Sequence, residues 1–560
     1  MKKYSMLKIF LVVIGSSFIA AVDAQWNPDP SVNNLVCTVD FTKFDMSTLP
    51  DDNGGFLLIW QDSRNSSVIA GEGSGSDIYM QHVDVNGNIL WDIEGVPLII
   101  EEEDQVDPEI ISDGDNGIYI IWFDNRNGID QIDFYMQHID FDGNLLWASN
   151  GIRLTSLNFT TANDIQKEIV TDGEGGALIC FHGHTDESAT DEIIFVSRID
   201  NEGDLIWSEK IVCNESPSDV TGLEMVTDGQ GGAFITWDDY RTSNKSIAVQ
   251  HINNDGDMLW VDNGILITTL VDVDFNSPVA AFDGESGVYI AWADWRNDVT
   301  QVHAQHLDEN GNILWAENGV AGSDPDDFQT EYKVEASSDG GALLVWEVGS
   351  PQEIYAQKIN NAGERLWGNE ALNVFSPVDD TEQSSIIVSD GFGGAVISAA
   401  EIATPTLLKV RNVKPDGSFN GDQVIAANAP SSKFSINILK AEDNKWIFSW
   451  VEEKVEDQHY IYASKIEFVP YTTPITNYQN MESELKIYPN PNNGLFNLHL
   501  NEITLNEKII LIYNGLNELI YEINLLQQDV EIDLSDHAAG VYLIKLITDN
   551  SLKSYPVVVQ

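Results

Sequence analysis

An aspartate and an arginine two residues apart recur four times along the chain, each time directly after an apolar stretch. Arginine binds carboxylates through two parallel hydrogen bonds, so a cluster of such arginines could hold an acidic ligand. Because the pair recurs from repeat to repeat, an ion pair that locks the same turn each time is the favoured interpretation. The pairs are Asp62/Arg64, Asp124/Arg126, Asp239/Arg241 and Asp294/Arg296.

Two of these pairs enclose an aromatic residue, Tyr240 and Trp295, where the other two copies have Ser63 and Asn125. These rings are out of register with the aromatic residues expected in the core. We therefore expect them at a rim of the protein, where they could stack on a sugar or a peptide. Together with Arg241 and Arg296 they form the predicted ligand-binding set.

A single segment combines side chains that bind metals. Cys180, His182, His184 and Asp186 alternate along the sequence, so an extended chain would present them on one face. The sequence shows no second cluster of ligands, and stray histidines are common in loops. His182, His184 and Asp186 are therefore the alternative prediction of a metal site, and the favoured prediction is that there is none.

Turns such as Asp84 to Asn88, with Gly87 at the fourth position, hint at a calcium loop. An EF-hand loop needs glycine at its sixth position and glutamate at its twelfth, and this spacing is absent here. A tight hairpin turn is the favoured interpretation, with Ca²⁺ as the alternative. The sequence assigns no catalytic residue and no cofactor.

The elements that position these residues are repeats. Eight degenerate copies of the block at 340–346, GGALLVW, end 51 to 62 residues apart. Each repeat holds four short apolar stretches, separated by Asp-Gly or Asn-Gly turns, which is typical of antiparallel strands. Four strands in about 50 residues make one propeller blade, so the fold class is all-β with eight blades, or alternatively seven.

Twelve of the 15 tryptophans keep fixed positions in the repeats, at the end of the second strand or the start of the fourth. We expect these side chains to be buried between neighbouring blades. The last repeat lacks a fourth strand, and 26–38 resembles one with nothing before it. The N-terminal strand is therefore expected to complete the last blade and to remove the open sheet edge. The propeller is predicted over 25–469.

The composition limits the partners. Ninety acidic residues against 28 Lys and Arg give a formal net charge of −62, which repels nucleic acids and anionic lipids. Residues 1–24 have a basic start, an apolar stretch and a small-residue cleavage site, which predicts a secretory signal peptide. No later stretch is long and apolar enough to span a bilayer. The three cysteines predict buried thiols rather than a disulfide framework.

The second repeat has a particular order of residues: Pro108, Asp113-Gly114, Asp124-x-Arg126, Phe134-Tyr135, Asp140-x-x-Gly143 and Leu154-Thr155. This order resembles the TolB-type family of propeller repeats. The resemblance supports the fold and implies no chemistry, because propellers serve in binding, scaffolding and catalysis alike.

The C-terminal part of the chain is a separate module. A polar stretch with two prolines, 470–482, predicts a linker, and the alternation in 483–560 predicts a small β-sandwich. This module contains Tyr488-Pro489-Asn490-Pro491 with Gly494, then Gly540, Tyr542 and Lys545, and finally Lys553. The pattern resembles the C-terminal sorting domain of the type IX (Por) secretion system of Bacteroidetes. The resemblance implies that these residues form the sorting signal and that the secretion machinery is a partner. It also implies passage across the outer membrane, usually with loss of the domain, and release or attachment to lipopolysaccharide.

Three functions remain open at this point. The favoured one is a non-catalytic, secreted or cell-surface propeller that binds a glycan or a protein. The first alternative is a propeller hydrolase or lyase acting on acidic polysaccharide, and the second is a structural surface protein. An enzyme should bring unique, non-repeated polar residues together at one mouth of the ring, whereas most polar residues singled out here are repeated.

Overall fold

The computed structural model describes two compact units, Met1–Tyr471 and Thr472–Gln560, which are treated separately below. The described residues run from 26 to 471 and from 485 to 559. Stretches without a description are 40–41, 52, 66–74, 129–130, 156–158, 161–165, 184–192, 215–221, 242–244, 271–272, 274, 297–298, 325–327, 350, 377–380, 403–405, 456–457, 489–493, 501–507, 514–518, 526–528, 536, 538–539 and 549–550. The predicted signal peptide lies outside the described residues. Within them, no helix has the length and apolar character to cross a membrane.

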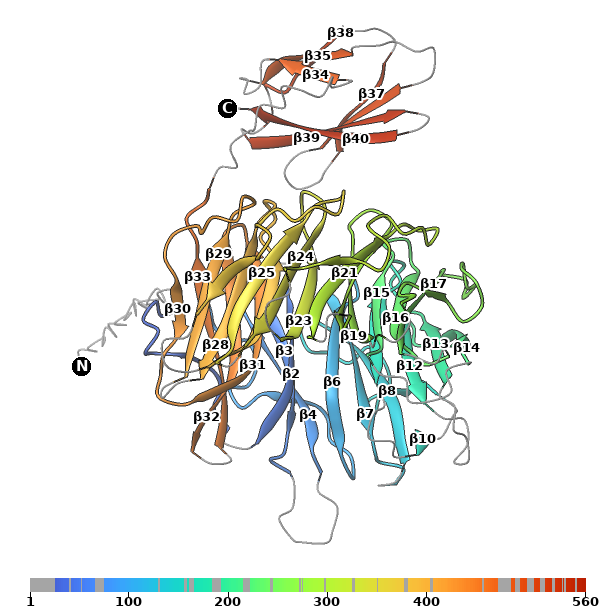
Figure 1. The fold of residues 1–560 in the computed structure, drawn as a ribbon. Coiled ribbons are helices and arrows are strands. Elements are labelled where there is room, and N and C mark those ends of the chain that lie inside the picture. The colour runs from blue at the N-terminus through green and yellow to red at the C-terminus, as the bar shows by residue number, and fades with distance from the viewer. Residues whose placement is uncertain are drawn as a thin grey trace, which may run out of the picture. The chain divides into compact units, whose positions relative to one another are not determined.

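The first unit is a ring of eight antiparallel sheets, which form the blades of a propeller (Figure 1). The prediction of an all-β fold with eight blades is therefore confirmed. The first blade contains β2 (Lys43–Pro50), β3 (Phe56–Asp62), β4 (Asp77–Val83) and β5 (Val96–Ile99), and the second contains β6 (Gln105–Ser112), β7 (Gly117–Asp124), β8 (Gln131–Asp140), β9 (Ile152–Arg153) and β10 (Phe159–Thr160). The third blade contains β11 (Lys167–Thr171), β12 (Ala177–Gly183), β13 (Ile193–Ile199) and β14 (Leu205–Cys213), and the fourth contains β15 (Glu224–Thr227), β16 (Ala233–Asp239), β17 (Ser246–Ile252) and β18 (Ile265–Leu266).

The other four blades follow the same order. The fifth blade contains β19 (Phe275–Phe282), β20 (Val288–Asp294), β21 (Gln301–Leu307) and β22 (Val320–Ala321), and the sixth contains β23 (Gln329–Ala336), β24 (Ala342–Val348), β25 (Glu353–Ile359) and β26 (Leu372–Phe375). The seventh blade contains β27 (Thr381–Ser389), β28 (Ala395–Ile402), β29 (Leu407–Val413) and β30 (Val424–Ala427), and the eighth contains β31 (Ser432–Glu442), β32 (Lys445–Val455), β33 (Gln458–Glu467) and β1 (Asn34–Cys37). In the eighth blade, β1 pairs antiparallel with β33, so the fourth strand comes from the N-terminal end of the described chain.

The second strand of each blade is buried over nearly its whole length, because neighbouring blades cover both of its faces. The tryptophans near its end are 0 % exposed in six blades: Trp60, Trp122, Trp237, Trp292, Trp346 and Trp450. Each of these indoles buries apolar surface between two neighbouring blades. Burial of this surface is the main contribution of such residues to stability. The expectation that they are buried is confirmed.

The tryptophans expected at the start of the fourth strand lie ahead of it in most blades. Trp91 precedes β5, and a turn closed by the hydrogen bond from Gly95 N to Asp92 O separates the two. The turn interrupts the strand ladder, so these indoles reach across to the next blade instead. Trp315, for example, donates to the carbonyl of Asn361 in the sixth blade, at 3.1 Å.

The second unit consists of two sheets that share one apolar cluster, with Phe496, Leu498, Ile512 and Ile544 at its centre. One sheet has the order β34 (Leu485–Tyr488), β35 (Leu495–Leu500) and β38 (Asp529–Asp533). The other has the order β37 (Leu519–Leu525), β36 (Lys508–Tyr513), β39 (Gly540–Thr548) and β40 (Ser551–Val559).

Candidate functional site

The first strand of each blade lies innermost in the ring, because it contacts the first strands of both neighbouring blades. Six of these eight strands contain a register shift just after they begin, as between Phe44 and Ser47 in β2. At each shift a residue other than glycine takes a positive φ: Asp45 (48°), Asp107 (52°), Ser277 (52°), Glu331 (45°), Ser384 (56°) and Ser435 (48°). Such backbone strain gathers at functional sites, so the inner strands around the ring axis, called the channel below, are candidates for a functional site.

A pocket of about 360 Å³ opens at these bulges between the first three blades. It is lined by Asp45, Met46 and Ser47 from β2, by Asp107, Pro108 and Glu109 from β6, and by Gln166, Lys167 and Glu168 at β11. The pocket is therefore lined by four carboxyl groups and one ammonium group, that of Lys167. The Lys167 ammonium lies 2.7 Å from Asp107 Oδ2 and 4.6 Å from the centroid of the Phe123 ring. It is therefore held by an ion pair and a cation–π contact at the wall of the pocket.

The glutamates of three consecutive innermost strands interact with one another. Burial raises the pKa of Glu109 to about 7, against the attraction of Lys167 and with repulsion from Asp107 and Glu224. Burial raises the pKa of Glu224 to about 7 as well, opposed by Lys333. The pKa of Glu168 lies well above its usual range because of burial and the repulsion of Glu224 and Glu109. Titratable groups with raised pKa values in a concave site are candidates for binding or for acid–base chemistry.

The pKa of Asp45, which also lines the pocket, is raised as well. Burial raises its pKa, Asp107 adds repulsion, and Lys167 opposes both. The site therefore carries more negative charge than Lys167 balances, which makes it suited to a positively charged ligand group. In the described parts of the chain, no three His, Cys, Asp or Glu side chains come together closely enough to hold a metal ion.

The predicted ligand-binding arginines have internal partners. Arg241 Nε lies 2.8 Å from Asp239 Oδ1, and its Nη2 also donates to Asp239 and to the carbonyl of Asn263. Arg296 makes the same contacts with Asp294 and with the carbonyl of Asn318. In the fourth blade the aspartate is held in turn by the tryptophan of the second strand, through the 3.0 Å bond from Trp237 Nε1 to Asp239 Oδ2. This geometry matches a repeated turn lock and gives no support to carboxylate binding by these arginines.

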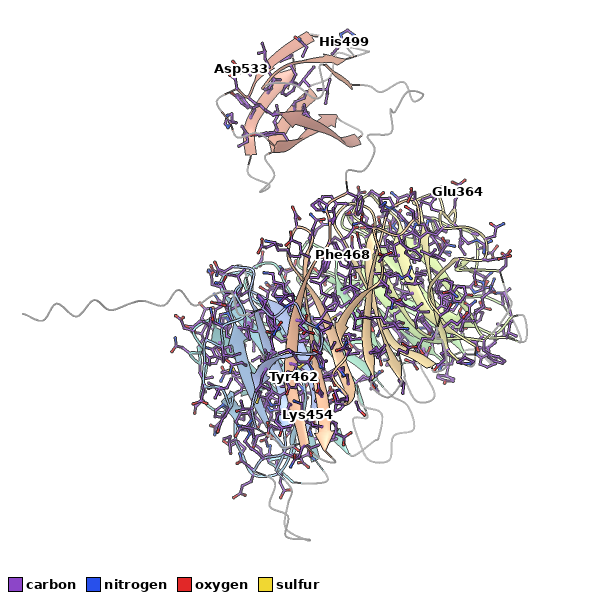
Figure 2. The ribbon with its side chains drawn as sticks, turned by 90° about the vertical axis from the view of Figure 1, so that its left-hand side faces the viewer. Glu364, Lys454, Tyr462, Phe468, His499 and Asp533 are labelled. Atoms are coloured by element: carbon purple, nitrogen blue, oxygen red, sulfur yellow. The ribbon has the colours of Figure 1, made fainter. Side chains whose placement is uncertain are left out.

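In the eighth blade Glu452 and Lys454 take the sequence positions of the Asp and Arg, two and four residues after the tryptophan. Trp450 Nε1 donates to Glu452 Oε2 at 3.2 Å. The ammonium of Lys454 lies 4.7 Å from the centroid of the Tyr462 ring, and the two side chains are neighbours in Figure 2. Arg64 lies over Tyr79 in the same way, with 3.7 Å between its Cζ and the ring centroid. In the first, second and eighth blades, the repeated element is thus a cation that lies over an aromatic ring and is attracted by the acid two residues before it.

The two aromatic residues predicted at a rim differ in their surroundings. Trp295 is 40 % exposed and meets Phe328, which is 50 % exposed, edge to face at a centroid distance of 5.7 Å. Tyr240 is half-buried, with the Lys245 ammonium 5.3 Å from its ring centroid. Trp295 and Phe328 therefore form an exposed aromatic corner between the fifth and sixth blades. The structure does not bring this corner and the channel pocket into one site.

The weak metal candidate is described only in part. His182 is 0 % exposed, and its Nε2 accepts the backbone N–H of Gln166 at 2.9 Å. This acceptor role indicates a structural histidine at the base of β11. His184 and Asp186 lie outside the described residues, so their part in a metal site stays a prediction.

The turns that hinted at calcium are closed from within. Asp84 Oδ1 accepts the backbone N–H groups of Asn86 and Asn88, and Oδ2 accepts Asn88 Nδ2 at 2.8 Å. Burial acts to raise the pKa of Asp84, but these hydrogen bonds lower it overall. The aspartate therefore serves its own turn, and calcium binding there stays a prediction.

Comparison with known proteins identifies the family of the C-terminal module. Residues 486–560 match the family model described as "Secretion system C-terminal sorting domain". The chain carries a type IX sorting domain. It is thus an exported protein of the cell surface or the exterior, and the type IX machinery is its partner. In the sorting domain, Tyr488 ends β34, Gly494 has a φ of 98°, Gly540 begins β39, and Tyr542 is 4 % exposed in the core. Lys545 and Lys553 lie in β39 and β40, whereas Pro489, Asn490 and Pro491 lie outside the described residues.

The propeller has distant likenesses among solved structures. A protein of unknown function from Dyadobacter fermentans is 10 % identical with a TM-score of 0.38, covering 78 % of this chain and 99 % of that one. The polysaccharide lyase Uly1 is 11 % identical with a TM-score of 0.43, covering 64 % and 89 %. An α-L-arabinofuranosidase from Fusarium graminearum is 11 % identical with a TM-score of 0.33, covering 64 % and 92 %. These likenesses assign neither an activity nor a ligand. No curated protein matches the chain, and the TolB-type resemblance stays an expectation.

The sequence analysis missed the channel residues. Asp45, Asp107, Glu109, Glu168 and Glu224 belong to four different blades, and only the three glutamates share a position in the repeat. Glutamate directly before the apolar core of the first strand, as in EIIS, EIVT and EMVT, was the available signal. Its meaning depends on knowing that these strands are innermost and adjacent.

Proposed function

We propose that this exported propeller is a binding protein, which takes a positively charged group of a glycan or protein ligand into the pocket between β2, β6 and β11. The observation that carries the proposal is the set of four carboxyl groups around the single ammonium of Lys167 in a pocket of about 360 Å³. An ammonium or guanidinium group bound there would satisfy carboxylates that now repel one another.

The charge of the whole chain supports the same class of ligand. A net charge of −62 steers cationic groups toward the protein and repels anionic polysaccharides. Burial of Glu109 and Glu168 strengthens this effect, because the dielectric constant around buried groups is lower than in water. A glycan with free amino groups or a lysine-rich segment of a protein fits these conditions.

A direct test compares binding by the chain 25–560 and by its Glu109→Gln/Glu168→Gln variant. The probes are glucosamine oligomers and lysine-rich peptides, with N-acetylated oligomers and glutamate-rich peptides as their uncharged and anionic counterparts. The matched control is Glu317→Gln, on an exposed turn of the fifth blade. We expect the double variant to lose at least about tenfold in affinity for the cationic probes, or ~1.4 kcal/mol. Equal binding by the wild type and the double variant would refute the proposal.

One observation favours an enzyme as the second candidate. Carboxylic acids with pKa values near 7, as for Glu109 and Glu224, suit general acid–base catalysis at neutral pH. A propeller hydrolase would release reducing ends from a neutral or amino-bearing polysaccharide. A lyase, whose substrate must carry a uronate carboxyl group, would leave unsaturated ends. Turnover that is abolished in Glu109→Gln would favour this candidate over simple binding. Absence of both binding and turnover would leave a structural surface protein.

A further inference from the structure

The seam between the seventh and eighth blades is built differently from the others. At the other seams a tryptophan ahead of the fourth strand, or near its start, rests on a glycine in a turn of the next blade, as Trp260 does on Gly311 and Trp315 on Gly363. Gly421 stands at the corresponding position in the seventh blade, four residues after the turn glycine Gly417. This seam therefore lacks the large indole that joins the other blades.

The chain that follows the last propeller strand takes the place of this contact. Asn420 Nδ2 donates to the carbonyl oxygen of Val469 at 2.8 Å. Val469 is the second residue after β33, as Val85 is after β4 and Glu309 after β21. Those two carbonyls accept the indole hydrogen bonds of Trp26 and Trp260, at 2.9 and 3.0 Å. The Asn420 amide thus makes the same bond that an indole makes elsewhere.

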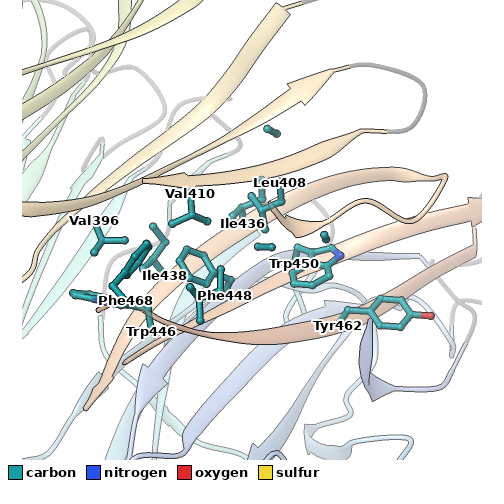
Figure 3. Packing of buried hydrophobic residues seen from close by; sticks show 14 residues of the cluster. Val396, Leu408, Val410, Ile436, Ile438, Trp446, Phe448, Trp450, Tyr462 and Phe468 are labelled. Atoms are coloured by element: carbon teal, nitrogen blue, oxygen red, sulfur yellow. The ribbon is translucent and has the colours of Figure 1, made fainter. Parts of the chain in front are cut away.

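The residues on either side of Val469 anchor it in both blades. Phe468 is 5 % exposed and belongs to the apolar cluster of Trp446, Ile438 and Val396, which comes from both blades (Figure 3). Its backbone N–H donates to the carbonyl of Asn444 at 2.9 Å, which fixes the segment to the eighth blade.

Tyr471 fixes the other end of the segment to the seventh blade. Its hydroxyl donates to Asp390 Oδ2, in the turn between β27 and β28, and its ring lies 6.2 Å from that of Phe392. The aspartate at this turn position is held by a side chain of its own blade elsewhere, as Asp51 is by His82 at 2.8 Å. In the seventh blade Asn412 holds Asp390 at 3.2 Å, and Tyr471 adds a second donor from outside the blade.

We propose that residues 468–471 are a strap that closes the seam between the seventh and eighth blades. The functional end of the propeller is then Tyr471, four residues beyond its last strand. A propeller that is separated from its sorting domain stays fully closed only if the break falls on the C-terminal side of Tyr471. The N-terminal end secures the seam to the first blade through Trp26, so both ends of the propeller's chain close the ring at the eighth blade.

The test cuts the folded chain 25–560 at two places. One variant carries an inserted protease recognition sequence between Tyr471 and Thr472, and the other carries it between Phe468 and Val469. Hydrogen exchange of the β28–β33 amides is measured before and after cleavage, with β16 and β17 as an internal reference. Cleavage after Tyr471 should leave exchange unchanged, whereas cleavage after Phe468 should accelerate it about tenfold near the seam, as expected for losing one or two hydrogen bonds.

Point variants keep the test decisive if an insertion prevents folding. Asn420→Ala and Tyr471→Phe should each accelerate exchange at the same seam by about threefold to tenfold, a range set by the loss of one hydrogen bond. Tyr521→Phe, which removes a hydroxyl from the sorting domain, is the matched control. Unchanged exchange after cleavage at Phe468, or in both point variants, would overturn the strap. Equal acceleration by the two cuts would overturn the boundary at Tyr471.

Discussion

The indole Nε1 of Trp26 donates a 2.9 Å hydrogen bond to the carbonyl oxygen of Val85. Trp26 lies ahead of β1 in the eighth blade, and Val85 lies in a turn of the first blade. Trp147 makes the same bond to Asn201 at 2.9 Å, and Trp367 makes it to Pro415 at 3.1 Å. The seam that joins the last blade to the first is therefore chemically equivalent to a seam inside the repeat, although its two sides are far apart in sequence.

Replacing Trp26 by alanine should destabilise the propeller, because the seam loses both the indole hydrogen bond and the packing on Phe56, whose ring centroid is 6.5 Å away. Trp26 is partly buried, so the expected loss is about 2–3 kcal/mol, below the range for a fully buried tryptophan. Urea unfolding followed by tryptophan fluorescence measures it. Trp295→Ala, which removes an indole that is 40 % exposed, is the matched control and should cost less than half as much. An equal cost in the two variants would contradict the role of Trp26 at the seam.

The turn glycines under these indoles offer a second matched comparison. Gly87 has a φ of 83°, and a Cβ added there would lie 3.0 Å from the Trp26 ring, whereas Gly114 has a φ of 80° and nothing within 4 Å. Alanine at either site bears the cost of a left-handed backbone, ~1–2 kcal/mol. Gly87→Ala should cost about 1 kcal/mol more than Gly114→Ala, because the indole must move. Thermal unfolding of the two variants side by side gives this difference, and a value near zero would mean that the seam adapts freely.

The Asp-x-Arg pairs are predicted to act on stability rather than on binding. Arg126 Nε donates to Asp124 Oδ1 at 2.8 Å, its Nη1 donates to the carbonyl of Asn150 at 3.0 Å, and its Cζ lies 4.1 Å from the Tyr135 ring centroid. Lysine cannot reproduce this planar fork, so Arg126→Lys should lower the free energy of unfolding by about 1–2 kcal/mol. Ligand affinity should stay unchanged, as checked with whichever probe the chain binds. A variant with normal stability and reduced binding would restore the ligand-binding hypothesis for these arginines.

Much of the fold could be predicted because repetition makes each position visible eight times. The tryptophans at Trp60 and its equivalents mark the end of the second strand, and Asp-Gly pairs such as Asp113-Gly114 mark the turns, so blade number and strand order follow from their period. The turn lock was also within reach, since a pair that recurs in four blades is expected to serve the blade itself.

The candidate site was out of reach because its meaning depends on the closed ring. Glu109, Glu168 and Glu224 share one position in three consecutive repeats, but only the ring shows that their strands are innermost and adjacent. The bulges that turn Asp45 and Asp107 toward the pocket depend on a register shift at the start of β2 and β6. The alternation of polar and apolar residues does not reveal such a shift. The sequence of β2 or β6 is amphipathic in either case, whether the strand pairs regularly or contains a bulge.

The raised pKa of Glu347 should make the free energy of unfolding depend on pH. Its side chain is 1 % exposed, and burial together with the repulsion of Glu331 raises its pKa from 4.5 to about 7. In the unfolded chain this group ionises near pH 4.5 but in the folded chain near pH 7, so stability falls as the pH rises between these values. Glu347→Gln should therefore stabilise the propeller at pH 8 by about 1–3 kcal/mol relative to the wild type and change it little at pH 4.5. Thermal unfolding across this range tests the sign, with Glu317→Gln as a control that should keep the wild-type slope.

The channel pocket should release protons when it binds a cation. Glu109 and Glu168 line the pocket and both have raised pKa values; that of Glu109 is about 7, so near neutral pH it is only partly ionised. A bound ammonium group favours the ionised form and lowers both pKa values, which expels protons into the solvent and makes affinity rise with pH between about 6 and 8. Calorimetry of a glucosamine oligomer in two buffers with different ionisation enthalpies measures the number released, and we expect between about 0.5 and 1 near pH 7. Glu109→Gln should reduce that number, while Lys167→Met should increase affinity, because the competing ammonium is gone. Proton uptake, or binding that strengthens as the pH falls, would show that the ligand is not held by these carboxylates.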